Sequence, residues 1–72
     1  LEEAVFNGVK VFNLLEGIRL EFEDEVSAYL FNVEVRWITD FQKRKSFFID
    51  RSQYKSGLYW IKTREETIKI RI

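Results

Sequence analysis

Apolar and polar residues alternate with a period of two along most of this chain. Residues 18–23 alternate apolar with charged side chains, and residues 67–72 alternate three isoleucines with Thr, Lys and Arg. Such alternation places the apolar side chains on one face of a β-strand and the polar ones on the other. Segments of the same kind, rich in β-branched and aromatic residues, are 26–30, 33–38, 47–50 and 59–62. Six segments at this short spacing predict an all-β domain, either a sandwich or a barrel.

The first seventeen residues fit two kinds of element. Their apolar residues lie near helical spacing, and Glu2 and Glu3 suit a helix N-terminus. Gly8 interrupts that pattern, and Val9 to Val11 alternate as a strand does. We adopt the strand interpretation. The alternative is an α+β fold in which an N-terminal helix packs on an antiparallel sheet.

The length and composition narrow the possible chemistry. A chain of 72 residues forms a single domain, 1–72, and this one contains neither Cys nor His. Disulfides, thiolate nucleophiles, imidazole catalysis and the usual zinc sites are therefore excluded. Asp40 and Asp50 do not show the spacing of a catalytic carboxylate pair, so we predict no enzyme and no cofactor. The apolar runs are too short for a membrane span. Because the chain starts at Leu1 and contains no Met, we expect a processed or trimmed piece.

The formal net charge is zero, but the charges are unevenly distributed. Residues 1–36 carry eight acids and three bases, whereas residues 37–72 carry nine bases and four acids. We expect the two halves to pack as neighbouring strands that bring opposite charges together. The alternative is a basic surface that binds an acidic partner.

A run of acids is the candidate for a metal site. Its members are Glu21, Glu23, Asp24 and Glu25. Calcium takes six to eight oxygen ligands, but this run lacks the Asp-x-Asp-x-Asp-Gly spacing of a dedicated calcium loop. We therefore predict a turn at Asp24 and Glu25, with the acids at a solvated hairpin tip, and no metal site.

A basic and aromatic region is the best candidate for partner binding. Grooves that bind nucleic acid combine cations for the phosphates with exposed rings for the bases. The other interpretation is a charged loop at Lys43–Lys45 between two strands. Trp37, Phe48 and Trp60 are also candidates for an exposed aromatic strip that docks a protein, a sugar ring or a second copy of the chain. The candidate partner-binding residues are Trp37, Lys43, Arg44, Lys45, Phe48, Arg51, Tyr54 and Trp60.

One segment resembles a known family. Residues 49–62 read Ile-Asp-Arg-Ser-Gln-Tyr-Lys-Ser-Gly-Leu-Tyr-Trp-Ile-Lys. This is similar to the hallmark segment of the C-terminal sorting domains used in type IX secretion by certain Gram-negative bacteria, and to related small immunoglobulin-like β-sandwich domains of secreted proteins. Val26 to Trp37 looks like the strand–turn–strand unit of these families, with Asn32 at the turn. We expect Gly57 to adopt a backbone conformation that a side chain would forbid, with Tyr59 entering the core as the strand begins.

The resemblance implies a fold and a class of function. The fold is a small antiparallel immunoglobulin-like β-sandwich of six to seven strands. The function is that of a non-catalytic secreted or cell-envelope module, either for secretion sorting or for accessory binding, with a protein or the secretion machinery as its partner and a homodimer as a further possibility. The alternative, from the residues alone, is a small cytoplasmic domain that binds nucleic acid or protein through the region Lys43–Tyr54.

Overall fold

Antiparallel strands make up most of the described chain. A computed structural model describes the backbone of residues 2–6 and 8–72 and the side chains of residues 8–72. No α-helix occurs in this part of the chain, so the predicted all-β class is confirmed and the alternative with an N-terminal helix is wrong. The elements are β1 (Glu2–Phe6), β2 (Val9–Asn13), β3 (Gly17–Asn32), β4 (Trp37–Asp50), the 3-10 turn η1 (Arg51–Gln53), β5 (Leu58–Lys62) and β6 (Thr67–Arg71).

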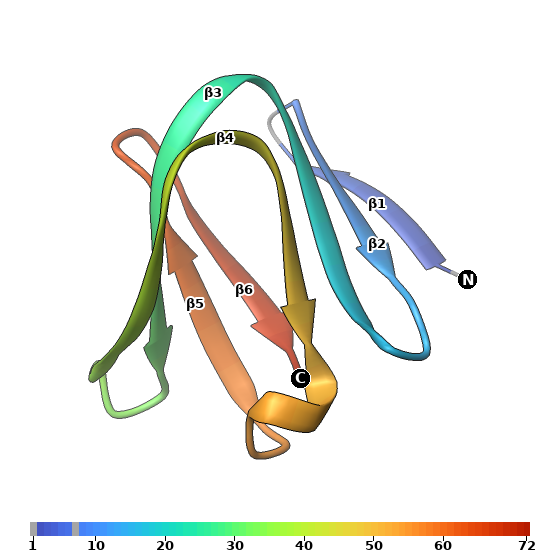
Figure 1. Cartoon of the computed structure of the whole chain (residues 1–72), viewed down its shortest axis with the longest axis vertical. Helices are drawn as coiled ribbons and strands as arrows, with labels where there is room; N and C mark the ends of the chain where they lie inside the picture. The colour runs from blue at the N-terminus through green and yellow to red at the C-terminus, as the bar shows by residue number, and fades with distance from the viewer. Residues whose placement is uncertain (1, 7) are drawn as a thin grey trace.

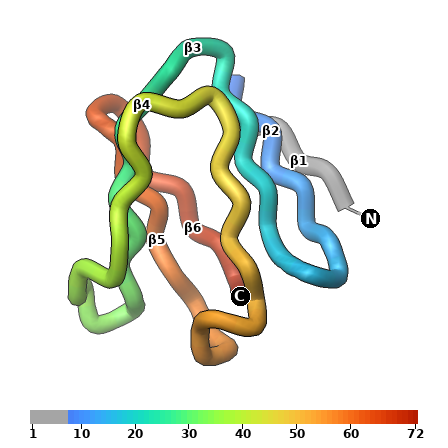
Figure 2. The backbone as a smooth tube through the Cα atoms, viewed as in Figure 1, coloured from blue at the N-terminus to red at the C-terminus, as the bar shows by residue number. Residues whose placement is uncertain are grey.

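The six strands form one sheet that curls into a half-barrel around β3 (Figure 1). Along one edge of β3, residues 18–21 pair with β2 and residues 29–32 pair with β5. The other edge of β3 pairs with β4. Both long strands arch together over the molecule, side by side (Figure 2). The arch divides the sheet into two layers.

We call the two layers A and B, and each contains one half of β3 and the half of β4 that pairs with it. Layer A consists of β1, β2, residues 17–21 of β3 and residues 46–50 of β4. Layer B consists of residues 37–41 of β4, residues 28–32 of β3, β5 and β6.

The sequence predicts two breaks between strands where the structure has the continuous strands of the arch. The turn predicted at Asp24 and Glu25 is wrong, because β3 continues through these residues with a shift of register between Glu21 and Val26. The loop predicted at Lys43–Lys45 is also wrong, because these residues lie within β4. Lys43 has a φ of 42°, and its N–H donates to Ser27 Oγ at 3.3 Å. An irregular ladder of this kind bends and twists a strand without ending it.

The strand predicted at 33–38 is wrong in its first part, because residues 33–36 form the turn between β3 and β4. Asn32 builds this turn, since its Oδ1 accepts hydrogen bonds from the N–H groups of Glu34 and Arg36, both at 3.0 Å. The Val35 N–H donates to the Asn32 carbonyl at 2.9 Å, and Val35 has a φ of 62°. A β-branched residue is strained in this left-handed conformation.

The core lies between the two layers. Three rings pack beneath the arch: Phe47 lies 4.9 Å from Phe41 and 5.4 Å from Phe22, measured between ring centroids. The prediction that the isoleucines of residues 67–72 share one buried face is confirmed. The buried apolar residues are Val9, Ile18, Leu20, Ala28, Leu30, Phe47, Ile49, Tyr59, Ile61, Ile68, Ile70 and Ile72.

Two glycines are required for different reasons. Gly57 has a φ of 150°, as predicted, and exchanges two backbone hydrogen bonds with Ile72, at 3.0 and 2.9 Å. Tyr59 then enters the core, also as predicted. Gly17 is required by space, because a Cβ added there would lie 2.2 Å from the Ile49 carbonyl oxygen.

Candidate binding face

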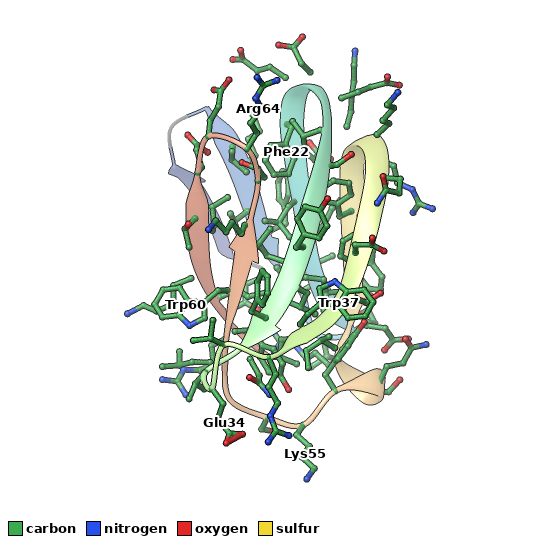
Figure 3. The ribbon with its side chains drawn as sticks, turned by 90° about the vertical axis from the view of Figure 1, so that its left-hand side faces the viewer. Phe22, Glu34, Trp37, Lys55, Trp60 and Arg64 are labelled. Atoms are coloured by element: carbon green, nitrogen blue, oxygen red, sulfur yellow. The ribbon has the colours of Figure 1, made fainter. Side chains whose placement is uncertain are left out.

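Three aromatic side chains lie in one row across the outer surface of layer B. Phe31 of β3 pairs with Trp37 of β4 on one side and with Trp60 of β5 on the other. Residues directly opposite in a ladder project from the same face of the sheet, about 5 Å apart. Trp37 is 59% exposed, and Phe31 and Trp60 are half-buried. Figure 3 shows the two tryptophans on either side of β3. We call Trp37, Phe31 and Trp60 the aromatic row.

A β-bulge completes the aromatic row. Leu30 pairs with Thr39 and Phe31 with Trp37, so Ile38 has no partner in the ladder. A regular ladder would place Ile38 opposite Phe31 and turn Trp37 toward the other side of the sheet. The extra residue therefore directs the indole of Trp37 outward.

Cations border the aromatic row on the same face. Lys69 of β6 pairs with Trp60, and its Nζ lies 5.8 Å from the centroid of the Trp60 ring. This geometry is that of a cation–π contact. Lys62 and Tyr29 form the next pair along β5 and β3. We call this surface the aromatic face; its charged and aromatic members are Tyr29, Phe31, Trp37, Asp40, Trp60, Lys62, Lys69 and Arg71.

The aromatic face has a positive charge balance, although the chain is neutral overall. It carries three cations, Lys62, Lys69 and Arg71, and one carboxylate, Asp40. That carboxylate accepts a hydrogen bond from Gln42 Nε2 at 2.9 Å. Local charge rather than net charge determines which ligands a surface attracts.

Phe48 lies on the other layer and does not join the two tryptophans. It pairs with Arg19, which pairs in turn with Phe12. The charged side chain of Arg19 therefore separates the two rings on the outer surface of layer A. The ring of Phe48 also covers Gly17, where an added Cβ would meet Phe48 Cζ at 2.7 Å.

The basic run Lys43–Lys45 lies on the arch, beside the acidic run. Arg44 pairs with Val26, so the cations of β4 and residues 23–25 of β3 occupy neighbouring strands. The expectation that the two halves pack as neighbouring strands of opposite charge is confirmed for this pair of strands. The basic run therefore lies beside the acidic run and apart from the aromatic row.

Arg51 and Tyr54 stabilise the end of the fold where the β2–β3 turn, η1 and the end of β6 meet. The Arg51 guanidinium donates to the carbonyls of Leu14 and Arg71, at 3.2 and 3.4 Å, and to Oδ1 of Asn13. These bonds join the β2–β3 turn to the end of β6. The half-buried ring of Tyr54 packs edge-on against Tyr59 with 6.2 Å between centroids. Both side chains are occupied in packing and hydrogen bonding within the chain.

An open pocket of about 670 Å³ lies under the arch, next to the β5–β6 turn. Val9, Phe22 and Val26 contribute apolar surface to its lining, and carboxylates from residues 23–25 and 65–66 contribute its acidic part. Among the described residues, no group of three or more carboxylates is arranged to hold a metal ion.

The residues that sequence reasoning missed are those that complete the aromatic face. Phe31 connects the two tryptophans, and Lys62, Lys69 and Arg71 surround them. Alternation already indicated that Lys69 and Arg71 lie opposite the buried isoleucines. It does not indicate which strand lies alongside, because that depends on hydrogen bonds between distant segments.

The chain was compared with known proteins at three levels. No protein-family model, no curated protein and no solved structure matches it. Across residues 2–6 and 8–72, no helix is long and apolar enough to cross a lipid bilayer.

Proposed function

We propose that this chain is a non-catalytic binding module whose ligand stacks on the aromatic face. The observation that carries the proposal is the pairing of Trp37, Phe31 and Trp60 in one row across three neighbouring strands. Contiguous exposed apolar surface on a small domain is typical of interaction sites. Tryptophan also offers a large rigid contact area at a low cost in conformational entropy.

The position of the row on a hydrogen-bonded sheet supports this function. Its three side chains come from β3, β4 and β5, and the Leu30 and Ile61 side chains that alternate with them are fully buried in the core. A site on rigid strands holds its contact groups in place before the ligand arrives, which lowers the entropic cost of binding.

The family resemblance implies two roles, sorting and accessory binding. An aromatic row on the outer surface of layer B supports accessory binding. The sorting role, the immunoglobulin-like arrangement and the secreted or cell-envelope location stay predictions. Cell fractionation would test the location, a secretion assay with and without this chain would test the sorting role, and an experimental structure would test the strand arrangement.

The two tryptophans of the chain make the proposal directly testable. Both lie on the aromatic face, so tryptophan fluorescence and the two indole N–H signals in an NMR spectrum report on this face alone. We expect at least one of three probes to shift both indole signals: a single-stranded oligonucleotide, a neutral oligosaccharide or a peptide without tryptophan. The double variant Trp37→Ala, Trp60→Ala should lose that binding, whereas Phe48→Leu on layer A should retain it.

Two results would overturn the proposal. In the first, none of the three probes shifts the indole signals. In the second, a probe binds and the double variant binds it equally well. If the indole signals instead shift as the protein itself is concentrated, the ligand is a second copy of the chain, and the aromatic face is a dimer interface.

A further inference from the structure

Building on the proposed function, we infer that the ligand of the aromatic face is single-stranded nucleic acid. The inference rests on the combination of aromatic rings with cations on the outer surface of one sheet layer. Proteins that bind single strands combine aromatic side chains, on which the bases stack, with positive charge that follows the phosphates.

The rings supply the stacking platform. Trp37, Phe31 and Trp60 follow one another across β4, β3 and β5 at the separation of neighbouring strands, about 4.8 Å. Tyr29 lies two residues before Phe31 on the same face and is 41% exposed. Bases of a single strand present both flat surfaces, whereas bases inside a duplex are already stacked on their neighbours. The row therefore favours a single strand over a duplex.

The cations supply the contacts for phosphate. Lys69 extends the aromatic row onto β6, and Lys62 and Arg71 lie on the same face of β5 and β6. A strand whose bases stack on the row places its phosphates along this β5–β6 side. Lys62 also lines the pocket under the arch, where carboxylates of residues 23–25 and 65–66 lie together with Lys43 and Arg64.

A neutral sugar fits this surface less well. Proteins recognise sugars through hydrogen bonds in which carboxylates accept from the sugar hydroxyl groups and side-chain amides donate to or accept from them. The carboxylate of the aromatic face, Asp40, already accepts a bond from Gln42. The remaining charged groups, Lys62, Lys69 and Arg71, match an anion.

Titration with an oligothymidylate of about ten nucleotides, followed by tryptophan fluorescence at low salt, tests the inference. We expect quenching that saturates and an affinity that falls with salt. Three phosphate contacts predict a slope of about −2 for the logarithm of the association constant against the logarithm of salt concentration, because each contact on a single strand contributes about −0.7. Saturable quenching with no salt dependence would overturn the role of the cations.

Matched variants distinguish the contribution of the rings to binding from that of the cations. Trp37→Ala should weaken oligothymidylate binding by about tenfold or more, in the range measured for one stacked base. Phe48→Leu, an exposed ring on layer A, should leave it unchanged. Lys69→Ser should make the salt slope shallower by about 0.7, whereas Lys10→Ser on β2 should not alter it. Circular dichroism of each variant checks that the fold is retained. If Trp37→Ala and Phe48→Leu bind equally well, the inference is wrong.

Three further probes distinguish the inference from the proposed function. Inorganic polyphosphate and a blunt-ended duplex should bind more weakly than the oligothymidylate. If polyphosphate binds as tightly as the oligothymidylate, the surface recognises charge alone and the inference is wrong. A neutral oligosaccharide or a peptide that shifts both indole signals while the oligothymidylate does not would also overturn it, but would leave the proposed binding function standing. If no probe shifts the indole signals, both the inference and the proposed function are overturned.

Discussion

The two layers carry aromatic rings on their outer surfaces but arrange them differently. On layer B, Trp37, Phe31 and Trp60 are direct neighbours across three strands. On layer A, Arg19 separates Phe48 from Phe12. A contiguous row offers one stacking surface, whereas two rings divided by a charged side chain do not.

The rings also differ in what they cover. Phe48 lies over Gly17, where the backbone of β3 approaches the Ile49 carbonyl closely. Trp37 lies beside a turn and a bulge, and it is more exposed than Phe48, at 59% against 43%. An exposed aromatic residue is thus no indication of binding by itself. A packing role is distinguished from a binding role by the atoms that the ring covers and by the residues that lie beside it.

The largest expected effect concerns Gly17 of layer A. Gly17→Ala should destabilise the fold by about 3 kcal/mol or prevent folding, because the new methyl group meets the Ile49 carbonyl oxygen and the Phe48 ring. Chemical denaturation measures the loss. Arg19→Ala, at an exposed position on the same strand, should change the stability by less than about 0.5 kcal/mol. An equally small effect at Gly17 would show that Phe48 does not cover a close backbone approach.

Gly57, before β5, should give the next largest effect. Gly57→Ala should cost about 2 kcal/mol, because a φ of 150° is strained for any residue with a side chain. Space is not the cause, since no atom outside the two neighbouring residues lies within 4 Å of the added Cβ. Thermal melts measure this loss of stability, and Ser56→Ala, at an exposed position, is the control. If Gly57→Ala left the stability unchanged, the position of β5, and with it that of Trp60, would not depend on this backbone conformation.

The turn next to Trp37 offers a stabilising substitution. Val35→Gly should raise the stability by about 1 kcal/mol, because it relieves the left-handed strain of a β-branched residue that is 74% exposed. Val33→Gly, in the same turn without a positive φ, should lower the stability by about 0.5–1 kcal/mol. Denaturation midpoints of the two variants should therefore move in opposite directions. A shift in the same direction would contradict the turn geometry that places Trp37 beside Phe31.

The smallest effect depends on pH and concerns the end of β4 in layer A. Hydrogen bonds from the Ser52 hydroxyl and backbone N–H lower the pKa of the Asp50 carboxyl below its ordinary value. Asp50 therefore contributes stability near neutral pH, and the contribution is lost as the pH falls through the lowered pKa, below about 4. Asp50→Asn should be slightly less stable than the parent at neutral pH. This difference should disappear in acid, as followed by thermal melts. A difference that stays constant with pH would show that Asp50 does not act through its charge.

The sequence by itself determined which side of a strand most residues occupy. Alternation placed Phe47 inside and Phe48 outside, and Tyr59 inside and Trp60 outside, as the structure has them. It also excluded thiol and imidazole chemistry through the absence of Cys and His. These features are local, because successive side chains of an extended backbone point in opposite directions wherever the strand lies.

Only the tertiary structure decided which rings become neighbours. The charged runs at 23–25 and 43–45 continue through the arch instead of ending strands, and residues 33–36 turn instead of extending. The bulge at Ile38 then places Trp37 beside Phe31, and β5 pairs on the far side to add Trp60. Register and bulges are set by hydrogen bonds and packing between segments far apart in the chain. A pattern read along one segment therefore identifies the face of a residue but not its neighbours on that face.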